Sequence, residues 1–208
     1  MMKKIALLCA LVVSCTLFAS CSGLVSLTND GGNLVDKKNG ITYAMAPICF
    51  EPISTEIEPY AECTSLNLQL YGIIGLDTDT WLSEKYDGIG GVYYNQATVT
   101  LPTLDEFEPT QIMICAEGTI TTGLGSVTEQ ADVDAVVEAF VNGEVTALVQ
   151  SGDSYKLKFS SEKYDGIYYN LIYIEGDDGE NYIYDRSTKT CVNVGGVLLD
   201  YLPRESAS

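Results

Sequence analysis

Residues 155–175 read YKLKFSSEKYDGIYYNLIYIE, and this stretch decides the fold class. Apolar residues at positions 155, 157 and 159 alternate with lysines at 156 and 158, which is the two-residue period of a strand with one wet face. After the turn at Asp165-Gly166, positions 167–174 are apolar on both faces apart from Asn170, as in a central strand. The stretch therefore predicts an antiparallel hairpin inside a larger sheet.

The same hairpin chemistry extends along the chain in both directions. Gly176-Asp177-Asp178-Gly179 is a turn sequence, so the meander continues into another strand. One helix is expected from Thr128, as its cap, to Asn142, with an apolar stripe at 133, 136, 137, 140 and 141 and Gly143 as its stop. Further strands are expected at 41–45, 66–71, 91–101, 111–116, 145–150 and 181–186, and a short final helix at 197–202.

These elements predict an α+β protein, mainly antiparallel β-sheet with one packed amphipathic helix. We expect a signal peptide at 1–20, a flexible tether at 21–40, a β-rich unit at 41–127, and a helix plus β-meander unit at 128–208. The tether is predicted from the polar, Gly- and Asn-rich composition of this segment. Residues 41–208 are long enough for one compact domain with a sizeable core.

An internal repeat supports two related β units. The seven residues SEKYDGI at 83–89 recur at 161–167, and Tyr-Tyr-Asn follows each copy. One interpretation makes these loops ligand-binding, because exposed aromatic faces stack on sugars or peptide side chains. The other makes each copy a turn whose tyrosines pack on the sheet. The candidate ligand-binding residues are Trp81, Tyr86, Asp87, Tyr93, Tyr164, Asp165 and Tyr168.

The N-terminus carries an export signal. Lys3 and Lys4 precede an apolar run from Ile5 to Ala19, which is too short for a membrane span. The segment Leu17-Phe18-Ala19-Ser20-Cys21 resembles the lipobox of bacterial lipoproteins. The resemblance implies that Cys21 is acylated and anchors the protein, outside the cytoplasm, to the cell membrane, or to the outer membrane where the cell has one. The alternative is an ordinary secretory signal that leaves Cys21 a free thiol.

Composition excludes several kinds of chemistry. The formal net charge is −18, which disfavours nucleic acid because its phosphates require Lys and Arg. There is no histidine, which removes Ser-His-Asp machinery and the commonest zinc ligand. No phosphate-binding loop or Cys-x-x-Cys motif is present, so the sequence predicts neither a cofactor nor a metal.

Four cysteines lie beyond the anchor, at positions 49, 63, 115 and 191. In an exported protein an even number allows disulfides, and Cys49 with Cys63 is the shortest closure. The alternative is that all four are buried thiols acting as small apolar side chains.

The function expected from the sequence is a non-enzymatic cell-envelope lipoprotein that binds a protein or glycan partner. Its membrane contact would be the lipid anchor. One alternative is a carboxylate-dependent hydrolase at the cell surface, since paired acids can cleave glycosidic bonds. The other is a purely structural domain.

Overall fold

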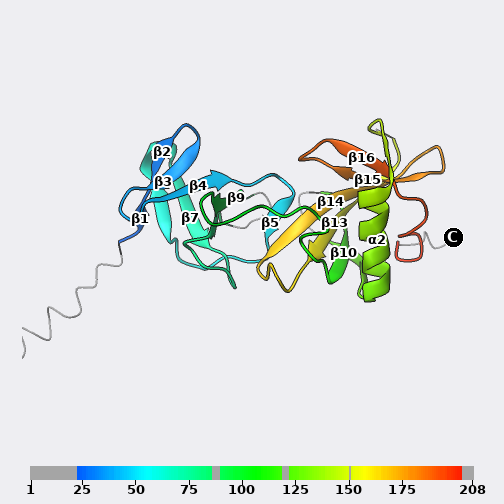
Figure 1. The fold of residues 1–208 in the computed structure, drawn as a ribbon, viewed down its shortest axis with the longest axis horizontal. Helices are drawn as coiled ribbons and strands as arrows, with labels where there is room; N and C mark the ends of the chain where they lie inside the picture. Colours follow the sequence, from blue (N-terminus) through cyan, green and yellow to red (C-terminus); the bar gives the residue numbers. More distant parts are fainter. Residues whose placement is uncertain (1–22, 86–89, 119–121, 150, 203–208) are drawn as a thin grey trace, which may run out of the picture.

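The computed structural model describes residues 23–85, 90–118, 122–149 and 151–202. It is α+β, with two mainly antiparallel sheets and one packed amphipathic helix (Figure 1). The elements of the first half are β1 (Val25–Ser26), β2 (Thr28–Asp30), β3 (Asn33–Asp36), β4 (Ile41–Met45), β5 (Phe50–Pro52), β6 (Ala61–Cys63), η1 (Thr64–Leu66), β7 (Leu68–Gly72), β8 (Trp81–Ser83) and β9 (Val92–Asn95). Those of the second half are β10 (Gln111–Ala116), β11 (Gly123–Val127), α2 (Gln130–Asn142), β12 (Glu144–Thr146), β13 (Asp153–Ser160), β14 (Ile167–Glu175), β15 (Asn181–Asp185) and β16 (Thr190–Asn193).

The first sheet is rolled. Its strand order is β1-β6-β7-β8-β9-β4-β3-β2. Strands β1 and β2 stand at opposite ends of this order, yet only Leu27 separates them in sequence, so the sheet must curl until its edges meet. The rolled sheet encloses a small core of buried side chains: Leu27, Leu34, Tyr43, Ala61, Cys63, Leu70, Leu82 and Tyr93.

The predicted tether at 21–40 is wrong over its described part, because β1, β2 and β3 lie there. Its glycines and asparagines form tight turns instead. Gly31 and Gly32 have φ of 60° and 94° and join β2 to β3. Asp36 is buried and accepts hydrogen bonds from the Lys38 and Asn39 backbone N–H groups, at 2.9 and 3.1 Å. Turn and linker compositions are alike, which explains the error.

The second sheet has the order β11-β10-β13-β14-β15-β16-β12, and β5 from the first half pairs with β14. The quoted stretch forms β13 and β14 as an antiparallel pair, and the strand expected after the turn at Asp165-Gly166 covers Ile167–Glu175. The bounds expected for 41–45 and 111–116 are confirmed. Because β10 and β11 belong to this sheet, the division between the two sheets falls between Asn95 and Gln111, not at 127/128.

Several predicted ends were wrong. The strand expected at 66–71 begins at Leu68, after η1 and the left-handed Asn67 (φ 50°). The strand expected at 91–101 ends at Asn95. The Asn95 carbonyl oxygen accepts hydrogen bonds from the backbone N–H groups of Thr98 and Val99, which turn the chain. The strand expected from 145 covers only Glu144–Thr146. Residues 197–202 form successive turns, with Leu198 buried, in place of a helix.

Helix α2 covers one face of the second sheet (Figure 1). Its N-cap is Glu129, with no side-chain cap hydrogen bond, so Thr128 is not the cap. Gly143 follows its last residue with φ −73°; a Cβ there would overlap the Ala139 carbonyl oxygen and the Val192 side chain. The helix therefore stops at a close approach to the sheet that only glycine permits.

One core joins the two sheets. Phe50 and Trp81 from the first half are buried in the same cluster as Phe159, Tyr173 and Val133 from the second. The two β units are thus packed together as one body.

Candidate functional site

Both copies of SEKYDGI connect neighbouring antiparallel strands. The first copy follows β8 and leads to β9, and the second follows β13 and leads to β14. Tyr86 and Asp87 lie outside the described residues, as does Cys21. The repeat therefore marks equivalent hairpins in the two sheets.

The Tyr-Tyr-Asn segments pair with one continuous piece of chain. Tyr94 of the first lies opposite Ala44 of β4, and Tyr169 of the second lies opposite Phe50 of β5. The chain from β4 to β5 thus crosses from one sheet to the other along both segments (Figure 1). This is an architectural role for the repeat.

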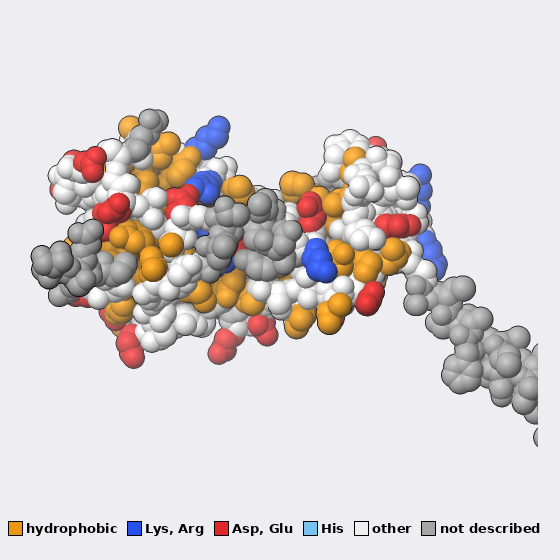
Figure 2. Space-filling view, turned by 180° about the vertical axis from the view of Figure 1, so that it is seen from behind, with side chains coloured by type: hydrophobic (Ala, Val, Ile, Leu, Met, Phe, Trp, Pro, Cys, Tyr) orange, Lys and Arg blue, Asp and Glu red, His pale blue; other side chains and the backbone are white. Residues whose placement is uncertain are grey.

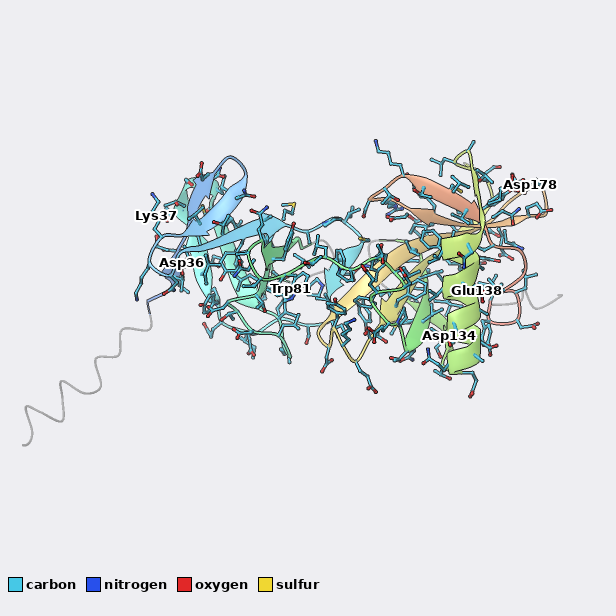
Figure 3. All side chains as sticks on the ribbon, viewed as in Figure 1. Asp36, Lys37, Trp81, Asp134, Glu138 and Asp178 are labelled. Carbon is cyan, nitrogen blue, oxygen red and sulfur yellow. The ribbon has the colours of Figure 1, made fainter. Side chains whose placement is uncertain are left out.

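A continuous row of aromatic rings fills the space between the sheets. Trp81 lies 6.1 Å from Tyr94 and 6.3 Å from Phe50, between ring centroids. Phe50 packs edge-on against Tyr169 at 5.2 Å. Figure 3 places Trp81 in the middle of the molecule, where the halves meet. These rings supply hydrophobic contact area within the fold.

The described candidate residues do not form a shared tyrosine-walled surface. Trp81 and Tyr93 are each only 4% exposed, and they belong to different core clusters. The Tyr93 hydroxyl donates to Glu84 Oε1 at 3.1 Å, and burial, followed by the nearby Glu84 charge, raises the Tyr93 pKa. Tyr164 is half-buried in a stack on Phe107, with ring centroids 5.1 Å apart.

The remaining two candidates lie on the second hairpin. Asp165 is exposed at its turn. Tyr168 is half-buried, with the Lys158 Nζ atom 5.1 Å from its ring centroid. An ammonium over a ring is a stabilising contact, and it occupies one face of the Tyr168 ring.

The four cysteines of the described residues are thiols. Cys49, Cys63, Cys115 and Cys191 are all free and buried, so the predicted pair Cys49 and Cys63 is not a disulfide. Cys49 lies in the core between the sheets, whereas Cys63 lies inside the rolled sheet. Burial raises the pKa of Cys49 to about 11, although the Ser187 side chain lowers it.

A buried ionic cluster was missed from the sequence. Glu51 of β5 pairs with both Lys156 and Lys158 of β13 and accepts a 3.0 Å hydrogen bond from Asn170 Nδ2. The Lys158 side chain is only 3% exposed, so the face predicted to be wet is largely covered. The local sequence could not predict these ion pairs, because Glu51 of β5 is more than 100 residues from the lysines of β13.

A groove lies between α2, the loop at 105–110 and the start of the second SEKYDGI copy. Its volume is about 660 Å³. Its lining combines five carboxylates, one lysine and apolar side chains, from Asp105, Glu108, Pro109, Thr110, Gln130, Asp134, Val137, Glu138, Val141, Asn142, Ser161, Glu162 and Lys163. We call this the acidic groove. Asp134 and Glu138 lie one turn apart on α2 (Figure 3).

Hydrogen bonds fix both walls of the acidic groove. The Gln130 Nε2 amide donates to the Pro109 carbonyl at 3.0 Å and to Asp134 Oδ1 at 2.8 Å. Lys163 pairs with Glu108 and donates to the Glu106 carbonyl at 3.1 Å. The helix stripe predicted Val141 to be buried, but it is 48% exposed. The sequence signal for this site was the row of acids at 134 and 138 beside valines at 137 and 141.

Carboxylates elsewhere are more scattered. Figure 2 shows acidic and apolar side chains spread over both halves of the rear face. In the described ranges, cysteine and acidic side chains nowhere gather in the groups of three that would hold a metal ion. Among the same residues no helix is both long and apolar enough to cross a bilayer.

The chain matches no protein-family model, and no curated protein or solved structure proved similar to it. Its function must therefore be argued from the acidic groove itself.

Proposed function

We propose that this protein is a lipid-anchored envelope protein without enzymatic activity, and that it binds a basic segment of a protein partner in the acidic groove. The observation that carries the proposal is the lining: within the described residues it has five carboxylates and one lysine, beside the exposed side chain of Val141. Lysine and arginine side chains complement both features, because their aliphatic stems cover apolar surface while their charged ends reach carboxylates.

A glycan is a weaker candidate for this site. Sugar rings are recognised by exposed aromatic faces, and the aromatic candidates Trp81 and Tyr93 are buried. Hydrolysis is also less well supported. A general acid needs a raised pKa, whereas the hydrogen bond from Thr103 lowers the pKa of Asp105 in the groove.

The expected anchor places the acidic groove well for a partner. Cys21 precedes the first residue of β1, Val25, by four positions, which span at most about 14 Å of extended chain. A lipid on Cys21 would hold the rolled sheet next to the membrane. Helix α2, whose residues line the groove, lies toward the opposite end of the molecule from β1 (Figure 1), so the groove would face the envelope space.

The test uses the full-length protein in a non-ionic detergent and a decapeptide of alternating Lys and Val. Binding is measured by fluorescence anisotropy as a function of salt concentration. Asp134→Asn with Glu138→Gln should weaken binding about tenfold, because two charge pairs are lost. The matched control is Glu56→Gln with Glu58→Gln, two exposed acids of the first half. Equal affinities for both double variants would contradict the groove assignment.

The anchor has its own test. Cells grown with labelled palmitate should yield labelled protein, and Cys21→Ser should abolish the label. Cys63→Ser is the control, since Cys63 is buried in the rolled sheet and should have no effect on labelling. Label that persists in Cys21→Ser would contradict lipidation at this residue.

A further inference from the structure

One end of the acidic groove leads to the open edge of the second sheet. Val141 and Asn142 line that end, and β12 begins two residues later at Glu144. Within the described residues, β12 is the last strand of its sheet and pairs only with β16. An edge strand presents unpaired N–H and C=O groups that can accept another strand.

Exposed apolar side chains lie along this edge, beside the exposed Glu144. Val141 is 48% exposed, Val145 68% and Leu148 44%, so three large exposed apolar side chains fall within eight residues. Val145 lies opposite Val192, a member of the main core, so it occupies the same face of the sheet that α2 covers. Singly scattered apolar residues need no explanation, but a cluster beside an open edge marks an interaction surface.

The junction between groove and edge is held rigidly. Gly143 joins α2 to β12, and it packs so closely on Ala139 and Val192 that even a Cβ would overlap them. The groove and the strand edge therefore keep a fixed relation. From Asp134 to Asn142 the helix rises about 12 Å, and β12 adds about 10 Å. Seven residues of extended chain, at about 3.3 Å each, span this length.

We infer that the basic partner segment binds in extended form, with one part in the acidic groove and the next part added as a strand to the open edge of β12. This inference rests on the proposed function and names the binding mode. The segment must alternate basic and apolar residues, because carboxylates line the groove and Val141 and Val145 flank the edge. Strand addition supplies main-chain hydrogen bonds, and the side chains supply specificity.

The experiment separates strand addition from charge attraction. Three Lys–Val decapeptides are compared on the full-length protein: the unmodified peptide, one N-methylated at every Val, and one N-methylated at every Lys. All three carry the same charge. Along an added antiparallel strand, alternate N–H groups point to the neighbour and to solvent. Methylation of one set should therefore weaken binding at least tenfold, while the other set binds like the parent peptide.

Hydrogen exchange gives the second measurement. The unmodified peptide should slow exchange of backbone amides in 144–146, and the weakly binding methylated isomer at the same concentration should not. If both methylated peptides bind like the parent, and Asp134→Asn with Glu138→Gln still weakens all three, strand addition is overturned while groove binding stands. If the unmodified peptide does not bind at all, both are overturned.

Discussion

The two SEKYDGI copies lie in equivalent hairpins, but their side chains contact different parts of the molecule. In the first copy, Glu84 accepts a hydrogen bond from the Tyr93 hydroxyl, and the Lys85 ammonium lies 5.8 Å from the Tyr71 ring centroid. Both side chains therefore contact residues of the first sheet. In the second copy, Glu162 and Lys163 line the acidic groove. The difference arises from the neighbours: among the described residues, those of the second copy line the groove with α2 and the 105–110 loop, and those of the first copy do not.

The asparagines that follow the copies differ in the same way. Asn95 is satisfied by its own unit: its Nδ2 donates to the Asp79 carbonyl at 2.9 Å, and its Oδ1 accepts from the Ala97 N–H at 3.0 Å. Asn170 donates to Glu51, which arrives from the other half of the molecule. The side chain of Asn95 thus bonds within the first unit, whereas that of Asn170 bonds a carboxylate that β5 brings from the other half.

The largest effect should come from the aromatic contact between the halves. Trp81→Ala should lower the free energy of unfolding by about 4 kcal/mol, because it removes a large buried side chain. Tyr164→Ala, in the second hairpin, should cost about 2 kcal/mol, because that ring is already partly exposed. Urea denaturation followed by circular dichroism measures both. Equal decreases in the free energy of unfolding for the two variants would contradict the prediction that Trp81 contributes more to stability than Tyr164.

The ionic cluster should give the next largest effect. Glu51→Ala should cost about 3 kcal/mol, since it leaves the Lys158 ammonium buried without its carboxylate. In the first unit, Glu84→Ala should cost about 1 kcal/mol, because it removes the hydrogen bond from the Tyr93 hydroxyl. Adding Lys158→Met to Glu51→Ala should recover part of the loss in the same urea experiment. A double variant less stable than Glu51→Ala would contradict the charge argument.

Alkaline pH should lower the free energy of unfolding through Cys49, which lies in the core between the two sheets. Its folded pKa of about 11 lies above the ordinary 9.0, so the stabilisation is present below pH 9 and is lost as pH rises from 9 to 11. The loss should approach about 2 kcal/mol relative to Cys49→Ala, which lacks this titration. Urea midpoints at pH 8, 9, 10 and 11 test it. If the urea midpoints of the two proteins fell in parallel with pH, the loss of stability would not come from Cys49.

The smallest effect should distinguish the two copies of the repeat directly. Lys163→Gln removes the one cation that the described residues place in the lining of the acidic groove, so the Lys–Val decapeptide should bind about threefold more tightly. Lys85→Gln makes the same change in the first copy and should leave affinity unchanged. An equal gain in both would point to overall charge, not to the groove.

Much of the fold was predictable because its signals are local. The alternation in 155–175 placed β13 and β14, and the stripe at 133 and 136 placed the buried face of α2. The strands β1, β2 and β3 were missed, and a tether was predicted in their place, because a hairpin built on Gly31-Gly32 has the composition of a linker. The repeat was visible as a sequence, but which of its side chains would be exposed was not.

By itself, the sequence determined the α+β class, the central hairpin, the helix and the equivalence of the two SEKYDGI turns. The tertiary structure alone decided that Glu51 meets Lys158, that Trp81 is buried between the halves, and that Glu162 and Lys163 face an acidic groove. The reason is physical. Strand and helix periods depend on neighbours a few residues apart, whereas these contacts depend on the strand order that brings β5 beside β14.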